Sequence, residues 1–219
     1  MKKRTLGGLP AHSARRGFTL VEVLIASAIL VLVIVGALGS YLYGLNTYSY
    51  DLGRSFVNRD YRNFMNDMSS TVTYCNQIRV YSAFNDRTAY VDINGNTSGN
   101  FVLCIYETLQ SDGTNNITRL VGYYQGNDGA KSPIRSFTVS TNVDSNTDVL
   151  TLIPAAATMN SSSHPLEYPD CVGLNPGDKV FRDFGNNGTG VMVFAQLRNP
   201  GNLMKKAANS IHFTVVRRS

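Results

Sequence analysis

Glu22 is the only charged residue in an apolar stretch that runs from Phe18 to Leu42. A carboxylate within a membrane costs at least ~2–3 kcal/mol on insertion scales, so it needs a partner or a function. A cut after Gly17 would give Phe18 a free α-ammonium group about one helical turn before Glu22. The same group on a neighbouring copy can also pair with this carboxylate. These residues therefore predict an ion pair that holds apolar helices together in register.

The basic charge of the chain lies in its first residues. The formal net charge is +5, but five of the 20 basic residues precede Gly17 and no acid accompanies them. The rest of the chain carries 15 basic and 15 acidic residues and is neutral. The charge therefore indicates a basic leader, and a nucleic-acid surface would need a patch that only the fold assembles.

The stretch after the leader has the length of a membrane span. Between Val23 and Gly39 it contains no charge, and Ser27 is its only polar residue. About 20 such residues cross a bilayer as a helix, and the preceding Lys and Arg residues predict a cytoplasmic N-terminus. Two simpler interpretations compete: a cleaved secretory signal ending near Gly36–Gly39, and a plain membrane anchor. Neither gives Glu22 a role.

The residues Gly17-Phe18-Thr19-Leu20-Val21-Glu22, followed by a long apolar helix, resemble the class III signal of type IV pilins and pseudopilins. In that family a prepilin peptidase cuts after the glycine and methylates the new N-terminal phenylalanine. The resemblance implies cleavage between Gly17 and Phe18, N-methylation of Phe18, and subunit recruitment through Glu22. The chain departs from the common pattern in its long leader and in having Gly36, Gly39 and Gly44 where many major pilins have a proline.

The resemblance also implies a role, partners and a location. We expect a minor pilin or pseudopilin of a type IV pilus or type II secretion pseudopilus, with its head in the periplasm or outside the cell. Its expected partners are other pilins, prepilin peptidase, the inner-membrane assembly machinery and, before assembly, membrane lipid. The expected segments are a leader at 1–17, a membrane-spanning and filament-core helix at 18–42, its amphipathic continuation at 43–75 and a head at 76–219.

The apolar stretch and the sequence that follows it together predict an α+β fold. In this fold a long N-terminal helix packs on an antiparallel sheet. The helix should reach Tyr74, with one apolar face formed by Val57, Tyr61, Phe64, Met65, Met68 and Val72. After Cys75, short β-branched runs separated by turn residues predict strands. These strands are Thr88–Ile93, Asn100–Glu107, Ile117–Tyr124, Ile134–Ser140, Asp148–Ile153, Gly190–Leu197 and Ser210–Arg217. The segment from Pro154 to Lys179 is expected to be a long surface loop.

Three cysteines, Cys75, Cys104 and Cys171, are too widely spaced for a zinc motif. In an exported chain one disulfide plus one buried thiol is expected, and the spacing does not identify the pair. Three buried thiols without a disulfide are an equal alternative.

No catalytic signature is present in the sequence, so no enzyme, cofactor or metal site is expected. The chain lacks a GxSxG, a phosphate-binding glycine loop and an HExxH. The spacing of Asp144, Asn146 and Asp148 matches the first three ligands of a calcium-binding loop. Val149 stands where such a loop requires glycine, so a polar turn is the favoured interpretation. His212 alternates with apolar residues, which favours a structural role. Of Tyr123 and Tyr124, one is expected to be in the core and the other exposed.

Two other functions remain open from the sequence. One is a binding or adhesion module on a simple membrane anchor. The other is a competence-type pilin for DNA uptake, which would need a basic surface on its head. Arg54, Arg59 and Arg62 form a basic cluster on the predicted helix, and a solvated helix face is the preferred interpretation of it.

Overall fold

The computed structural model divides the chain into two compact units, Met1–Thr47 and Tyr48–Ser219. The predicted segment boundaries after residues 17, 42 and 75 are a finer division that stays a prediction. The structure describes residues 17–86, 98–126, 132–155, 166–175, 177–184, 188–198 and 208–218.

Helix α1 spans Leu20–Tyr74, and both units contain part of it. In the globular unit, Tyr48–Ser219, its apolar residues recur at steps of three and four and form one buried face. Val57, Phe64, Met68 and Val72 are each 2% exposed or less. This spacing places them on one side of a helix, and the predicted face is confirmed.

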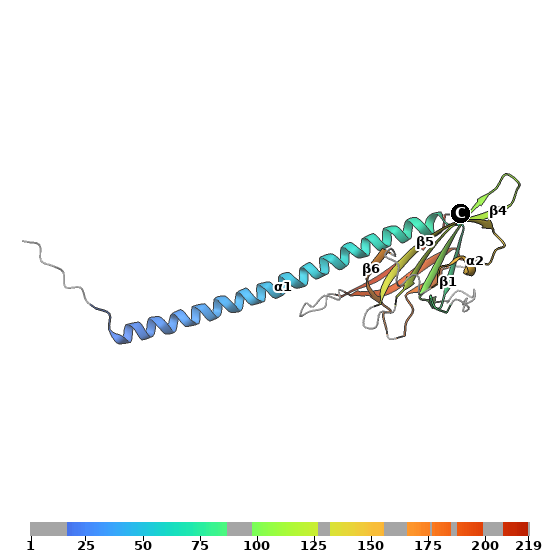
Figure 1. The fold of residues 1–219 in the computed structure, drawn as a ribbon. Helices are drawn as coiled ribbons and strands as arrows, with labels where there is room; N and C mark the ends of the chain where they lie inside the picture. Colours follow the sequence, from blue (N-terminus) through green and yellow to red (C-terminus); the bar gives the residue numbers. More distant parts are fainter. Residues whose placement is uncertain are drawn as a thin grey trace, which may run out of the picture. The chain divides into compact units, whose positions relative to one another are not determined.

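The described strands form one antiparallel sheet of nine strands (Figure 1). Its order is β1-β3-β4-β5-β6-β8-β7-β2. Strands β6 and β7 pair with successive parts of β8, and β9 pairs with the whole length of β8 along its other edge. The strands are β1 (Gln77–Tyr81), β2 (Ser98–Gly99), β3 (Phe101–Leu109), β4 (Asn115–Gln125), β5 (Pro133–Asp144), β6 (Leu166–Val172), β7 (Phe181–Phe184), β8 (Gly190–Arg198) and β9 (Ala208–Val216). The long helix and the antiparallel sheet confirm the α+β class.

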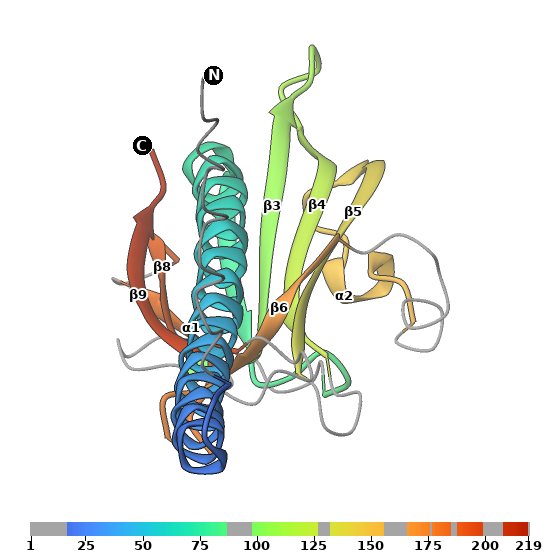
Figure 2. The ribbon, with the colours of Figure 1, turned by 90° about the vertical axis from the view of Figure 1, so that its left-hand side faces the viewer.

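The C-terminal part of α1 packs against one face of this sheet. Phe64 contacts Tyr123 of β4 and Phe213 of β9, with ring centroids 6.1 and 5.8 Å apart. Figure 2 shows this part of α1 between β3 and β9. A helix that lies against a curved sheet buries its apolar stripe on two groups of strands at once.

A second core covers the opposite face of β3, β4 and β5. Tyr124, Phe101 and Leu120 pack there with Phe84 and the short helix α2 (Val149–Leu152). Because successive residues of a strand point to opposite faces, Tyr123 enters the first core and Tyr124 the second. Both are buried, at 0% and 2% exposed, so the expectation that one of them is exposed was wrong.

Five of the predicted strands are confirmed as β3, β4, β5, β8 and β9, with ends that differ by a few residues. Predicted strand Thr88–Ile93 lies outside the described residues. The predicted strand Asp148–Ile153 was wrong, because this segment forms α2. Asp148 caps that helix by accepting a hydrogen bond from Leu150 N at 3.0 Å.

The predicted loop from Pro154 to Lys179 contains a strand, so that expectation was also wrong in part. Strand β6 pairs with β5 and β8 and joins the two halves of the sheet. Pro169 lacks the N–H group of a regular ladder, and the register between β5 and β6 shifts between the pairs on either side of it.

Candidate assembly site at the start of helix α1

The first turn of α1 is closed by a reciprocal pair of side chains, Thr19 and Glu22. Thr19 Oγ1 accepts a hydrogen bond from Glu22 N at 3.3 Å. Glu22 Oε2 accepts hydrogen bonds from Thr19 N at 2.9 Å and from Thr19 Oγ1 at 3.0 Å. This capping box satisfies backbone N–H groups that have no partner within a helix. The sequence Thr-Leu-Val-Glu thus fixes where the helix begins.

The cap also positions the carboxylate of Glu22. It folds back toward the N-terminal end of α1, and only Oε2 is engaged by Thr19. Within the part of the chain that the structure describes, Oε1 makes no hydrogen bond and Glu22 has no ion pair. One carboxylate oxygen therefore remains available to a cation near the start of the helix.

Gly17 and Phe18 precede α1 and are not helical. Phe18 is 87% exposed, and a Cβ added to Gly17 would meet no heavy atom within 4 Å. A peptide bond outside regular structure is accessible to a protease. The structure thus places the predicted cleavage bond in accessible chain directly before the capped helix.

Comparison with known families bears on this same segment. Residues 12–38 match the family model described as the prokaryotic N-terminal methylation motif. The chain carries the signature of the type IV pilins and pseudopilins. No match to a curated protein or to a solved structure was found.

The motif supports a pilin-like or pseudopilin-like protein. It implies processing by prepilin peptidase and assembly with other pilins, and its family is structural rather than enzymatic. Helix α1 is long and apolar enough to span a membrane once, and its most apolar part lies near the N-terminus. Together these features indicate a single-span membrane anchor.

The apolar side chains of this anchor are exposed in the part of the chain that the structure describes. The described residues from Phe18 to Tyr48 are all exposed, including Leu24, Ile29 and Leu32 at 55% or more. An exposed apolar surface of this extent needs lipid or other helices around it. The pilin-like chain therefore presents Glu22 on a surface that other molecules must cover.

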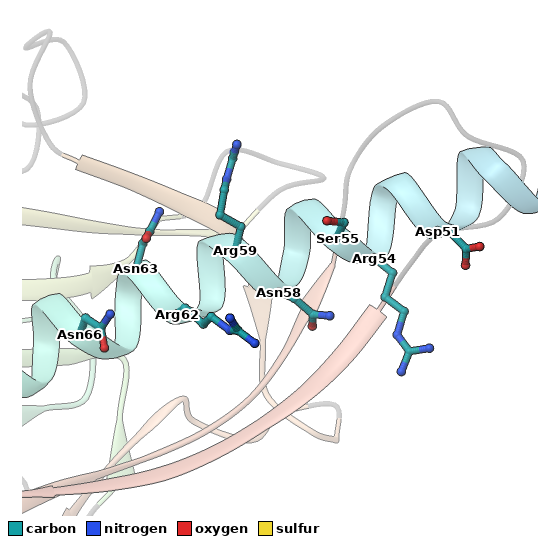
Figure 3. A pocket seen from close by; sticks show the side chains of 8 residues that line it. All are labelled: Asp51, Arg54, Ser55, Asn58, Arg59, Arg62, Asn63 and Asn66. Carbon is teal, nitrogen blue, oxygen red and sulfur yellow. The ribbon is translucent and has the colours of Figure 1, made fainter.

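A polar pocket lies on α1 in the globular unit. It is lined by Asp51, Arg54, Ser55, Asn58, Arg59, Arg62, Asn63 and Asn66. Figure 3 shows Arg59 and Arg54 pointing to different sides of the helix. Arg59 is also engaged by Asp60 at 3.2 Å. Because these arginines do not converge on one point, the interpretation as a solvated helix face is retained.

The remaining candidate residues are dispersed. Cys75 follows α1, Cys104 lies in β3 and Cys171 in β6, and all three are buried free thiols in the structure. His212 is exposed on β9 and stacks on Phe194 with ring centroids 4.3 Å apart. Asp144 accepts hydrogen bonds from Asn146 in a turn. No cluster of His, Cys, Asp or Glu suited to a metal occurs among the described residues.

Sequence reasoning gave Thr19 no role of its own. The spacing of Thr19 and Glu22, a hydroxyl followed three residues later by an acid, is the signal that could have identified the capping box.

Proposed function

We propose that this chain is a minor pilin or pseudopilin that is cut between Gly17 and Phe18 and methylated on the new terminal amine. It would then assemble into a type IV pilus or a type II secretion pseudopilus through the first part of α1. The observation that carries the proposal is the capping box, which holds Glu22 near the start of the helix with one oxygen available.

The energetics of Glu22 supply a reason to assemble. In lipid its carboxylate costs at least ~2–3 kcal/mol, and Thr19 compensates only one of its oxygens. In a bundle of copies, the terminal amine of a neighbouring Phe18 can approach Oε1 and neutralise the charge. Moving the apolar side chains from lipid to contact with other helices changes the free energy little. The ion pair therefore selects the register in which the helices pack.

The topology follows from the leader. Lys2, Lys3, Arg4, Arg15 and Arg16 precede the span, and cytoplasmic flanks are enriched in such residues. The N-terminus therefore stays in the cytoplasm, and the globular unit is exported across the inner membrane. In a filament this unit would lie on the outside and provide the surface that differs between subunits. Its size favours a minor over a major subunit.

The direct test is the mature N-terminus of the membrane-extracted protein, made with and without prepilin peptidase. Mass spectrometry should show N-methylated Phe18 only when the peptidase is present. Gly17→Val should block the cut, because a branched side chain would stand directly before it. Gly39→Val is the matched control, since a Cβ there also meets nothing within 4 Å.

The alternatives give different results in the same experiment. A chain that keeps Met1 in the presence of the peptidase is an ordinary anchored module, and the proposal fails. A mature terminus within residues 37–40 identifies a cleaved secretory signal and also overturns it.

A further inference from the structure

Two of the three cysteines meet at the junction of α1 with the sheet. Cys75 directly precedes Asn76, which is hydrogen-bonded to Ile105, the neighbour of Cys104 in β3, and each of the two thiols is the main influence on the pKa of the other. Both belong to the core between α1 and the sheet, at 3% and 0% exposed. Cys171 lies in the same core, but in β6, which pairs with β5 and β8 and not with β1 or β3.

The backbone around the two thiols is fixed from both sides. Asn76 N donates to Ile105 O at 2.8 Å, and Asn76 Oδ1 accepts from Glu107 N at 2.7 Å. Strand β1 begins at the next residue, Gln77, and pairs with β3 so that Ile78 lies opposite Cys104. On the helix side, Cys75 Sγ donates to Val72 O at 3.3 Å. The segment that carries Cys75 therefore cannot drift away from β3 without breaking these bonds.

We propose that Cys75 and Cys104 form a disulfide in the exported protein, which links the end of α1 covalently to β3. The inference rests on the proposed function, because that function places the globular unit in an oxidising compartment where disulfides persist. Cys171 remains a buried thiol. The pairing that spacing left open is thus assigned by the hydrogen bonds that hold the segment after Cys75 to β3, next to Cys104.

The reaction is a thiol–disulfide exchange with an exported thiol oxidoreductase or a small-molecule disulfide as the oxidant. One cysteine thiolate attacks the oxidant disulfide, which forms a mixed disulfide and releases one thiolate of the oxidant. The second cysteine then attacks the mixed disulfide, and the Cys75–Cys104 bond forms as the second oxidant thiolate leaves. The chain loses two protons and two electrons, and the oxidant is reduced to two thiols.

In the folded unit the two thiols influence each other in opposite directions. The neighbouring Cys104 lowers the pKa of Cys75, against the effect of burial, and the nearby Arg217 lowers it further. The neighbouring Cys75 and burial raise the pKa of Cys104. Since both sulfurs are enclosed in the folded unit, exchange must occur while β1 and β3 are still assembling.

The test is a disulfide map of the full-length protein recovered from cells that export it. Free thiols are alkylated in urea without reductant, and the protein is digested with trypsin. The three cysteines fall in three tryptic peptides, 63–79, 88–119 and 136–179. The proposal expects peptides 63–79 and 88–119 joined, with Cys171 alkylated. Three alkylated cysteines, or a link that includes Cys171, would overturn it.

Variants and reductant test the same pairing independently. Cys75→Ala and Cys104→Ala should each leave only alkylated cysteines, whereas Cys171→Ala should keep the joined peptides. Reduction should lower the Tm of the natural protein by about 10 °C, because the bond closes a loop of roughly 30 residues. The Tm of Cys75→Ala should not respond to reductant. The N-terminus read from the same digest separates a failure of export from a failure of the disulfide.

Discussion

The hydroxyl of Tyr123 in β4 lies 2.9 Å from Thr71 Oγ1 in α1, within the buried core. The same hydroxyl donates to Asp67 Oδ2 at 2.9 Å, one helical turn earlier. Burial raises the pKa of Tyr123 far above its usual range, so it stays a neutral donor. One phenol thus attaches the last turns of the helix to the middle of the sheet.

Tyr123→Phe should lower the free energy of unfolding of the globular unit by about 1–3 kcal/mol. The ring keeps its packing on Phe64, but Thr71 and Asp67 lose a buried hydrogen-bond partner. Urea unfolding followed by circular dichroism measures the change. Tyr74→Phe is the matched control, because Tyr74 is 68% exposed, and a loss of equal size there would contradict the account.

Phe64→Ala should cost about 3–5 kcal/mol, because it leaves a cavity between α1, β4 and β9. Phe56→Ala removes the same ring from the same helix where it is 49% exposed, and should cost under ~1 kcal/mol. Denaturant midpoints of both variants are compared. Equal midpoints would show that α1 does not pack through the face assigned to it.

Asp183 in β7 should make the stability of the globular unit depend on pH. Burial raises the pKa of this carboxyl, against a lowering hydrogen bond from Phe184 N. The folded state therefore holds the proton more tightly than the unfolded state does. The contribution of Asp183 to stability is then greatest below the ordinary carboxyl pKa of about 4 and is lost as pH rises through the raised value.

Unfolding between pH 3 and pH 7 measures this dependence. Asp183→Asn should flatten the fall in stability and raise the denaturant midpoint at pH 7. Asp51→Asn, an exposed acid on α1, serves as the control. An unchanged profile in Asp183→Asn would assign the pH dependence to other groups.

Thr19→Ala should weaken assembly without removing any charge. The substitution deletes the Thr19 hydroxyl from the capping box, which costs about 0.5–2 kcal/mol and lets the carboxylate reorient. The fraction of the chain recovered in filaments should fall several-fold, and Thr19→Ser should restore it. Ser27→Ala removes a hydroxyl that donates to Leu24 O within the same helix and should leave the fraction unchanged. If Ser27→Ala lowered the fraction recovered in filaments as much as Thr19→Ala does, the capping box would have no specific role in assembly.

The helix was predictable because its signals are local. Steps of three and four between Val57, Phe64, Met68 and Val72 place them on one face, whatever covers that face. The candidate site was predictable for the same reason, since Gly17, Phe18 and Glu22 lie within six residues.

The errors arose where distant parts of the chain decide the outcome. Val149 and Ile153 read as part of a strand, but one turn of helix brings both into the second core. Tyr123 and Tyr124 looked like one buried and one exposed residue, because the second core on the far face of β4 was not visible locally. Strand β6 contains Pro169, and its pairing depends on β5 and β8, which lie far from each other in sequence.

The central claim is that the negative charge of Glu22 recruits the amine of a neighbouring Phe18, and Glu22→Gln tests it most directly. Glutamine at this position retains an oxygen that can accept from Thr19 N, so the capping box survives while the charge is lost. The measurement is the ratio of chain in purified filaments to chain in the membrane, with the N-terminus checked by mass spectrometry. The account predicts normal insertion and processing, with incorporation reduced roughly tenfold or more, since each 1.4 kcal/mol of lost pairing is a factor of ten. Incorporation of Glu22→Gln at the level of the natural chain would contradict it.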